Sequence, residues 1–402
     1  MNIKPHYLLL DGLRGAAALM VLWYHVFEGF AFAGGSVIET FNHGHLGVDF
    51  FFMLSGFVIS YAYDDRWKSP RRRVSETPSQ PTANGLSVWS FFKRRLIRLH
   101  PMVVMGAVIG LITYLIQGGV QWDGTQVSFH WVMIAFFLGM CLIPVCPGAP
   151  YDVRGNGEMY PLNGPSWSLF FEYIGNILYA LFIRKLSDKK LVFLCGVTGI
   201  LWVAFVTFDV STYNMIGIGW TLDAVNFFGG LLRMLFPFTL GMLMSRKFNK
   251  TTRQRDYKPD SSTAKSQKPA FWISVVVLFA LFSVPYIPKT GNISINGIYE
   301  LFCIICVFPF IVWFGAAANI TNNFTTKLCK FLGDISYPLY IVHYPVMYLF
   351  YSWLIDNELY TLGETWPVVI LVMTVNIALA YACLKLYDEP VRKGLGIKGI
   401  RN

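Results

Sequence analysis

Eleven apolar runs dominate the chain and constrain its fold more than any other feature. A helix of about 20 apolar residues spans the hydrocarbon core of a bilayer, and most of the runs reach that length. Charged residues are 14% of the 402 residues, against about 25% in a soluble domain. We predict an all-α, polytopic integral membrane protein in which residues 1–402 form a single transmembrane domain. The runs lie near 8–31, 46–63, 101–118, 129–146, 166–183, 190–208, 226–245, 270–287, 298–317, 335–355 and 366–387.

The hydrophilic segments predict how the chain crosses the membrane. Segments 64–87 and 246–269 are basic loops and the tail after Pro390 is basic, whereas loops such as 119–128 carry no Lys or Arg. Basic loops stay in the cytoplasm, so both termini are expected there. Residues 100 and 184 then both lie on the cytoplasmic side, so the chain between them must cross an even number of times. Three apolar runs lie there, and we therefore expect 129–146 to be re-entrant or interfacial. We predict about ten transmembrane helices, the first retained rather than cleaved as a signal peptide.

Two other classes of protein are disfavoured by composition. The net charge of +10 does not indicate a nucleic-acid partner, because Lys and Arg cluster in the loops. Most of the seven cysteines lie within apolar runs. Cys303 and Cys306 are three residues apart, but no His or second Cys pair completes a zinc set. We expect buried, apolar cysteines, no disulfide framework and no metal, although His43, His45 and Asp49 are close in sequence.

Three ionisable residues interrupt residues 10–26 of the first apolar run. Asp11, Arg14 and His25 all lie within it, although such groups are costly inside a bilayer. Arg14 and His25 are eleven residues apart, which places them on one helix face roughly 16 Å apart along the axis. This spacing indicates a functional site or pathway. The alternative is a structural Asp11–Arg14 ion pair with a hydrogen-bonded core histidine.

Five motifs occur in order along this predicted bundle, and together they resemble the membrane acyltransferase 3 family. Its first-span pattern of Arg, ten residues and His matches Arg14 and His25, and His100 stands where the family more often has an aromatic residue. The resemblance implies transfer of an acyl group, commonly acetyl from acetyl-CoA, to a hydroxyl of a carbohydrate or other acceptor. It also implies a bacterial inner membrane. The motifs are LDGLRGAAALMVLWYH (10–25), GVDFFFMLSGFVIS (47–60), FFKRRLIRLHP (91–101), GPSWSLFFEY (164–173) and ISYPLYIVHYPV (335–346).

His25 is the best candidate for the catalytic group of such a reaction. O-acylation needs a base for the hydroxyl proton or a nucleophile that carries the acyl group, and histidine can serve as either. No Gly-x-Ser-x-Gly elbow is present. Direct transfer and an acyl-histidine relay both remain open.

Arginines before the third apolar run are candidates for binding the phosphates of an acyl-CoA donor. Arg94, Arg95 and Arg98 are spaced to share a helix face, and the guanidinium fork suits phosphate. The alternative is topology-setting charge with lipid headgroup contacts. Arg14 is expected to steer the pantetheine arm or to polarise the thioester carbonyl.

Glu172 is a carboxylate inside an apolar run and needs a partner. We expect it to orient His25, to pair with Arg14 or to hold the acceptor hydroxyl, with a structural salt bridge as the alternative. Further candidates for supporting roles are Asp11, Asp49, Ser55, Trp167, Ser168 and His343. His343 has a packed core role as its alternative, and Trp167 an interfacial one.

Two rival functions fit some of these features. A transporter or exporter of a small molecule or glycan precursor would also use buried charges and a re-entrant segment, but no inverted repeat is evident. A sensor or scaffold would leave the Arg14–His25 spacing unexplained. The acyltransferase reading implies the lipid bilayer, acyl-CoA and a carbohydrate or lipid-linked glycan acceptor as partners, with a homo-oligomer as a further option.

Overall fold

The computed structural model describes residues 7–35, 41–67, 86–256, 269–289, 293–318, 320 and 322–396, with side chains left undescribed at 252–256. Within these ranges the regular elements are helices, and extended pairing is limited to three isolated bridges. The helices are α1 (Leu8–Phe32), α3 (Leu46–Trp67), α4 (Val88–Ile116), α5 (Phe129–Met140), α6 (Ser166–Leu181), α7 (Asp188–Thr207), α8 (Ala224–Asp256), α9 (Ala270–Phe282), α10 (Ile295–Phe302), α11 (Phe308–Ala317), α12 (Asn323–Asp356), α13 (Leu362–Cys383) and α14 (Glu389–Gly394). Short π-helical segments at Cys303–Val307 and Leu384–Asp388 join α10 to α11 and α13 to α14.

Eight helices in the described part of the chain are long and apolar enough to cross a membrane. This confirms an all-helical chain with the character of a multi-pass membrane protein, whereas the count of ten and the side of the termini stay predictions. α9 has 13 residues and α12 has 34. α12 is not among the eight because its apolar part is rich in tyrosine and carries His343 and two prolines. The eight are Leu8–Phe32, Leu46–Trp67, Val88–Ile116, Ser166–Lys185, Asp188–Thr207, Ala224–Thr251, Ile295–Ala317 and Leu362–Gly394.

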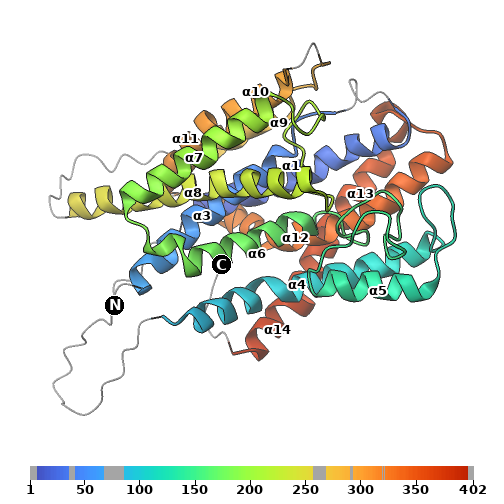
Figure 1. Ribbon diagram of the computed structural model, residues 1–402, viewed down its shortest axis with the longest axis horizontal. Coiled ribbons are helices and arrows are strands. Elements are labelled where there is room, and N and C mark those ends of the chain that lie inside the picture. The colour runs from blue at the N-terminus through green and yellow to red at the C-terminus, as the bar shows by residue number, and fades with distance from the viewer. Residues whose placement is uncertain are drawn as a thin grey trace.

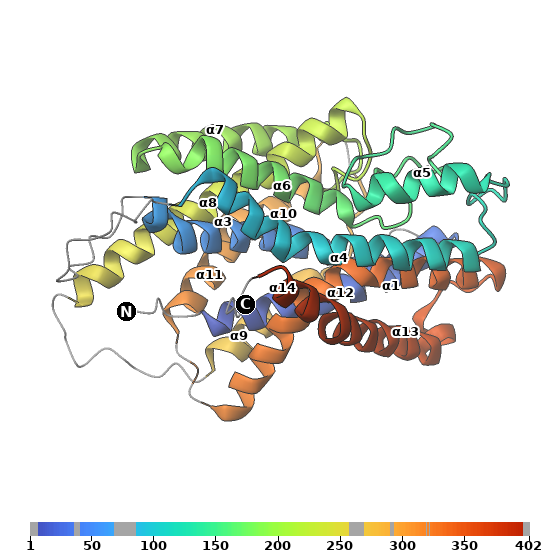
Figure 2. The ribbon, with the colours of Figure 1, turned by 90° about the horizontal axis from the view of Figure 1, so that it is seen from below.

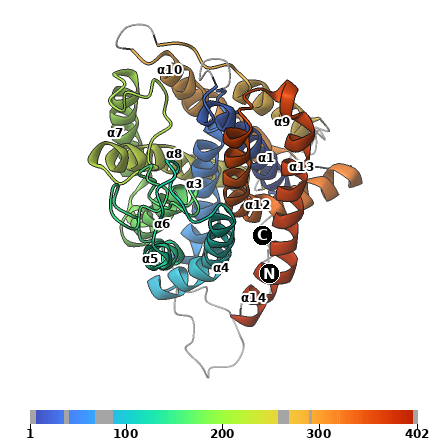
Figure 3. The same cartoon turned by 90° about the vertical axis from the view of Figure 1, so that its right-hand side faces the viewer.

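Three helices occupy the middle of the bundle. Most helices run along the long axis of the molecule (Figure 1), and the end-on view places α1, α3 and α12 centrally, with α7 and α8 on one flank and α9 and α13 on the other (Figure 3). α1 packs along α12, and α3 packs along α8. Buried side chains on α12 include four tyrosines, so these polar groups face protein rather than lipid.

Glycines allow these two helix pairs to approach closely. A Cβ atom at Gly15 of α1 would lie 2.2 Å from the carbonyl oxygen of Leu332 in α12. A Cβ atom at Gly56 of α3 would lie 1.9 Å from the carbonyl oxygen of Phe238 in α8. Small residues commonly bring backbones together in this way in membranes. The positions of polar side chains on α1 and α3 therefore depend on glycine.

α5 is the short helix of the segment predicted not to cross. Its 12 residues span about 18 Å, which is less than the thickness of the hydrocarbon core. It lies alongside the C-terminal half of α4 (Figures 1 and 2), and residues 141–165 then lead to α6 without forming another helix. This length accords with the re-entrant or interfacial course expected for 129–146, which stays a prediction.

Several helices extend further than the apolar runs suggested. α3 continues to Trp67 and α8 to Asp256, so the basic segments 64–87 and 246–269 begin as helix rather than as loop. The extensions are joined by an ion pair between Asp64 and Arg246, with Nε and Oδ2 2.8 Å apart. Residues 68–85 and 257–268 lie outside the described residues. The helical extensions form because charged side chains at these ends find partners on a neighbouring helix.

The cysteines only partly match the expectation of burial. All seven are free. Cys141, Cys146 and Cys306 are exposed, whereas the buried ones are Cys195, Cys303, Cys329 and Cys383.

Candidate active site

Two separate pockets lie within the bundle. The arginine pocket, of about 120 Å³, is lined by Arg14, Arg95, Arg98, Glu172, Ser55 and Ser168 among others. The histidine pocket, of about 500 Å³, is lined by His25, Glu28, Glu158, Trp167 and Tyr344 among others. Among the described residues, Val48 and Tyr340 line both.

α1 contributes one ionisable side chain to each pocket. Arg14 lines the arginine pocket and His25 lines the histidine pocket. They share one face of an unbroken helix, as the spacing predicted. The polar face of α1 therefore serves two neighbouring pockets rather than a single site.

Arg14 is held in place by three contacts. Its Nε donates to Ser336 Oγ at 2.9 Å and its Nη2 to the carbonyl oxygen of Gly333 at 3.2 Å. Its Nη2 also lies 3.3 Å from Asp11 Oδ1. The Asp11–Arg14 pair considered as an alternative thus exists, and Arg14 lines the pocket as well. The contacts fix the guanidinium at the pocket wall.

Glu172 takes a different partner from those expected. Arg95 Nη2 donates to Glu172 Oε1 at 2.8 Å, and Ser55 Oγ donates to the same oxygen at 3.0 Å. The expectation that Glu172 orients His25 or pairs with Arg14 is wrong for this structure, because α6 turns the carboxylate toward α4 in the arginine pocket. The salt-bridge alternative is the one observed.

Arg95 and Arg98 face the arginine pocket, but Arg94 does not. Arg95 is buried and its Nε has no partner among the described atoms. Arg94 is exposed and does not line the pocket, so its prediction as a donor-binding residue is corrected. Successive helical residues point about 100° apart, which turns Arg94 away once Arg95 faces inward. Arg392 of α14, which sequence analysis missed, lines the pocket beside its ion-pair partner Asp388.

His25 forms a dyad with Glu28, one turn further along α1. His25 Nδ1 donates to Glu28 Oε2 at 2.6 Å, and the same oxygen accepts hydroxyl hydrogens from Tyr344 and Tyr351 at 3.1 and 2.9 Å. A proton on Nδ1 leaves Nε2 with a lone pair. The arrangement can therefore act as a general base or as a nitrogen nucleophile.

His343 packs against His25 from α12. The two ring centroids are 5.1 Å apart, and His343 Nδ1 donates to the carbonyl oxygen of Leu339 at 3.0 Å. The side chain is 1% exposed, and Nε2 has no partner among the described atoms. The packed core role considered for His343 is observed, with one nitrogen unsatisfied.

Four candidates for supporting roles separate into different places. Asp49 lies outside both pockets and forms a buried pair with Arg233, whose Nη2 and Nε donate to it at 2.8 to 3.3 Å. Trp167 lines the histidine pocket, with the Arg233 guanidinium 5.0 Å from its ring. Ser168 and Ser55 line the arginine pocket. Asp49 is therefore a structural support rather than a member of either pocket.

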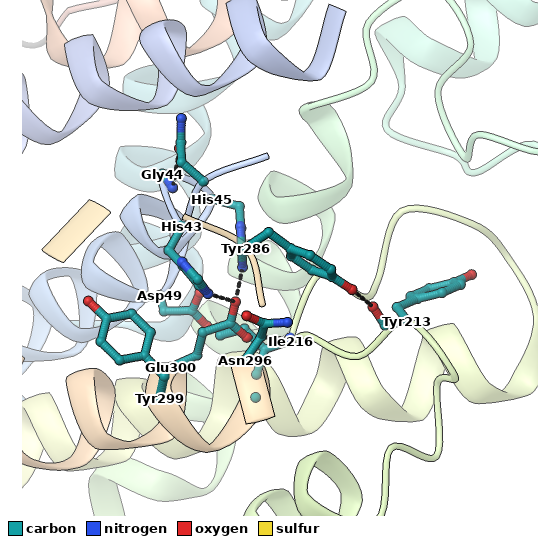
Figure 4. A network of polar contacts seen from close by, with 12 residues as sticks. His43, Gly44, His45, Asp49, Tyr213, Ile216, Tyr286, Asn296, Tyr299 and Glu300 are labelled. Carbon is teal, nitrogen blue, oxygen red and sulfur yellow. Dashed lines mark hydrogen bonds and ion pairs between the residues drawn. The ribbon is translucent and has the colours of Figure 1, made fainter. Parts of the chain in front are cut away.

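A buried polar network lies beside the histidine pocket (Figure 4). His45 Nε2 lies 2.7 Å and His43 Nε2 lies 3.6 Å from Glu300 Oε1. Burial, helped by the nearby Arg233, lowers the pKa of His45 to about 3, so this imidazole is neutral. Among the described residues, no three His, Cys, Asp or Glu side chains are arranged as metal ligands. The network ties the segment before α3 to α10.

Glu158, in the segment between α5 and α6, lines the histidine pocket. Tyr348 donates its hydroxyl to Glu158, and the Arg154 guanidinium lies 3.5 Å from the centre of the Tyr348 ring. Burial raises the pKa of the Glu158 carboxyl to about 7. This carboxyl therefore stays largely protonated below neutral pH and is about half ionised near pH 7.

Sequence reasoning missed Glu28, Glu158 and Arg233. The spacing of three residues between His25 and Glu28 on a helix was a usable signal, because such residues are neighbours. Glu158 and Arg233 meet their partners 190 and 184 residues away, and spacing along the chain gives no signal for such pairs.

Comparison with known proteins gives a consistent picture. Residues 7–385 match a family model described as an acyltransferase domain. The chain is 29% identical over 206 residues to "Protein 2 in picA locus" of Rhizobium radiobacter, covering 48% of this chain and 92% of that protein. It is 24% identical over 409 residues to a Staphylococcus aureus protein named "Putative O-acetyltransferase", covering 97% of this chain but 58% of the relative. It is also 24% identical over 356 residues to "Acyltransferase MdmB" of Streptomyces mycarofaciens, covering 84% and 78%. No solved structure matches.

Proposed function

Because the chain belongs to the acyltransferase 3 family and is an acyltransferase, we propose that it moves an acyl group, such as acetyl, from acyl-CoA to a hydroxyl of a carbohydrate or lipid-linked glycan precursor. The observation that carries this proposal is that α1 bears a basic group in one pocket and a His–Glu dyad in the next. A pocket for an anionic donor and a pocket for hydroxyl activation are the two parts that O-acylation needs.

The arginine pocket suits the phosphates of CoA. Arg14, Arg95 and Arg98 converge on it, and Arg95 offers a buried Nε–H without a partner among the described atoms. Guanidinium groups bind phosphate oxygens through forked donors. We propose that phosphate binds here and that the pantetheine arm extends toward Val48 and Tyr340.

His25 Nε2 then removes the proton of the acceptor hydroxyl. The oxygen attacks the thioester carbonyl, the carbon–sulfur bond breaks, and the departing thiolate takes the proton back from the imidazolium. In the alternative order Nε2 attacks the thioester first, the carbon–sulfur bond breaks and CoA leaves as a thiolate. The acceptor hydroxyl then attacks the acyl-imidazole, its proton passes to the CoA thiolate, and the neutral imidazole is released. In both orders Glu28 stabilises the positive charge that develops on the ring.

The histidine pocket supports a polyhydroxylated acceptor. Its walls include aromatic rings from several segments, with the carboxyl groups of Glu28 and Glu158 as hydrogen-bonding partners. Apolar walls with a few placed polar groups are typical of small-molecule sites. The wall residues of the Phe, Tyr and Trp types are Tyr24, Phe32, Phe41, Trp167, Tyr213, Trp220, Tyr286, Tyr340 and Tyr344.

We further propose ten transmembrane helices with both termini in the cytoplasm of a bacterial cell, with the arginine pocket on the cytoplasmic side. The eight long apolar helices with α9 and α12 would make ten. The basic segments begin at the C-terminal ends of α3 and α8, and α3 lines the arginine pocket as far as Ile59, which agrees with the positive-inside rule. The relatives are bacterial.

The first experiment is acetyl-CoA binding and CoA release by purified protein in detergent. His25→Gln is expected to abolish CoA release while keeping donor binding, because it removes the base and leaves the arginine pocket intact. Arg95→Ala is expected to weaken donor binding by about tenfold or more, from loss of a charged hydrogen bond.

Matched controls are available on the same chain. His130→Gln and Arg94→Ala change exposed side chains outside both pockets and are expected to behave like the wild type. If the folded wild type neither binds acetyl-CoA nor releases CoA, acetyl-CoA is the wrong donor and other acyl donors are tested next. Failure with those donors as well would favour the transporter function.

A further inference from the structure

The boundary between the two pockets is formed by few side chains. Val48 of α3 and Tyr340 of α12 line both pockets, and Ser168 of α6 lines the arginine pocket beside them. These three residues, here called the constriction, are 6%, 7% and 5% exposed. Any donor group that travels from the arginines to His25 inside the bundle has to pass between them.

Hydrogen bonds hold one wall of the constriction. Ser168 Oγ donates to the carbonyl oxygen of Pro165 at 3.0 Å, so its 2.7 Å contact with Tyr340 Oη is donated by the tyrosine. Phe51 packs edge-on against the Tyr340 ring, with centroids 5.5 Å apart. The ring is therefore fixed at both its hydroxyl and its face.

A buried ion pair and hydrogen bonds hold the other wall, where Val48 lies in the first turn of α3. The next residue, Asp49, pairs with Arg233, and Arg233 Nη2 also donates to the carbonyl oxygen of His45. His45 in turn contacts Glu300 of α10 (Figure 4). Moving Val48 would disturb a buried charge network, which is costly.

From this geometry we propose that the constriction selects the acyl group by its cross-section, admitting straight acyl chains and excluding chains branched next to the carbonyl. The proposal rests on the proposed function. A hydrocarbon chain without branches presents the same width at any length, whereas a branch adds a methyl group beside the carbonyl. A rigid opening with an apolar wall can favour the unbranched acyl group over one that carries an extra methyl branch by roughly 10- to 200-fold.

The test compares n-butyryl-CoA with isobutyryl-CoA, which have the same composition and differ in branching. The wild type is expected to prefer n-butyryl-CoA. Val48→Ala is expected to lower that preference about tenfold by removing two methyl groups from the opening. Val342→Ala is the matched control, because Val342 is buried on α12 but lines neither pocket, and it should keep the wild-type preference.

A second variant separates passage from binding. Val48→Phe is expected to keep measurable binding of the CoA phosphates, because Arg14, Arg95 and Arg98 are unchanged, but to release CoA from acetyl-CoA at least tenfold more slowly. Thermal unfolding identifies any variant that does not fold. An unchanged preference in Val48→Ala, or normal turnover in folded Val48→Phe, overturns the constriction while leaving the acyltransferase proposal in place. A wild type that takes no acyl group from any CoA overturns the proposed function itself.

Discussion

At the scale of single residues, Glu28 determines which nitrogen of His25 is available for reaction. Its carboxylate accepts the hydrogen on Nδ1 and also receives two tyrosine hydroxyls. Because Nδ1 carries the hydrogen that Glu28 accepts, Nε2 is the nitrogen with a lone pair, as the proposed mechanism requires. The dyad is built within one helical turn, and α12 supplies the tyrosines that keep it in place.

Glu28→Gln is expected to reduce CoA release by about 10² to 10⁴-fold, since the amide keeps the shape but cannot stabilise an imidazolium ring. Steady-state rates with acetyl-CoA measure the effect. Glu358→Gln changes an exposed carboxylate and serves as the control. Near-normal rates in Glu28→Gln would mean that His25 does not depend on this partner.

Glu158 makes stability depend on pH. Burial raises its pKa in the folded protein to about 7, from an ordinary value of 4.5. Between these values the folded state binds more protons than the unfolded state, so the free energy of unfolding falls as pH rises from about 4.5 to 7. Glu158→Gln is therefore expected to gain stability over the wild type, by about 3 kcal/mol at pH 8 and little at pH 4.5. Thermal unfolding in detergent at several pH values measures this, and a difference that does not change with pH would contradict it.

Several individual residues were predictable, and their partners mostly were not. The spacing of Arg14 and His25 predicted a shared helix face, and α1 has it. Asp49 and Glu172 were recognised as needing partners, but Arg233 and Arg95 lie on other helices, 184 and 77 residues away. A single sequence carries no signal for contacts of that kind.

At the scale of helices, the fit of α1 against α12 positions both pockets. Gly15 lets the backbones meet, Arg14 bonds to Gly333 and Ser336, and Glu28 bonds to Tyr344 and Tyr351. The apolar runs predicted that helices form in these parts of the chain, but they did not predict where α3 and α8 end. Polar residues extend both helices because an ion pair between them stabilises their ends. A change of helix spacing would therefore alter both pockets together.

Gly15→Ala is expected to destabilise the protein by about 1–3 kcal/mol, because the added methyl group would overlap the Leu332 carbonyl. Gly196→Ala on α7 is the matched control, since a Cβ there meets no atom within 4 Å. That control should be neutral or gain about 0.5–1 kcal/mol from helix propensity. Equal unfolding temperatures for Gly15→Ala and the wild type would show that the two helices can separate freely.

At the scale of the whole molecule, α5 determines how many times the chain crosses the membrane. If α5 enters and returns on one side, Thr125 and Lys189 lie on opposite faces of the bilayer, because α6 is then the only crossing between them. We expect Thr125→Cys to react with a membrane-impermeant thiol reagent in intact cells, and Lys189→Cys to react only after permeabilisation.

The labelling uses a background in which the exposed Cys141, Cys146 and Cys306 are replaced by serine. Both engineered cysteines occupy exposed positions, so access to the reagent is matched. Labelling of both from the same side would mean that α5 crosses completely.

The separation of the two pockets has an evolutionary consequence. Among the described residues, Val48 and Tyr340 alone line both pockets. A substitution at any other wall residue therefore alters the wall of one pocket and leaves the wall residues of the other unchanged. If the histidine pocket holds the acceptor and the arginine pocket holds acyl-CoA, as proposed, mutations around Glu158 and Trp167 can retarget the enzyme to new acceptors and leave the donor pocket unaltered. Such a layout lets the histidine pocket diverge while the arginine pocket is kept. It predicts that enzymes descended from one ancestor differ most in the acceptor that they acylate.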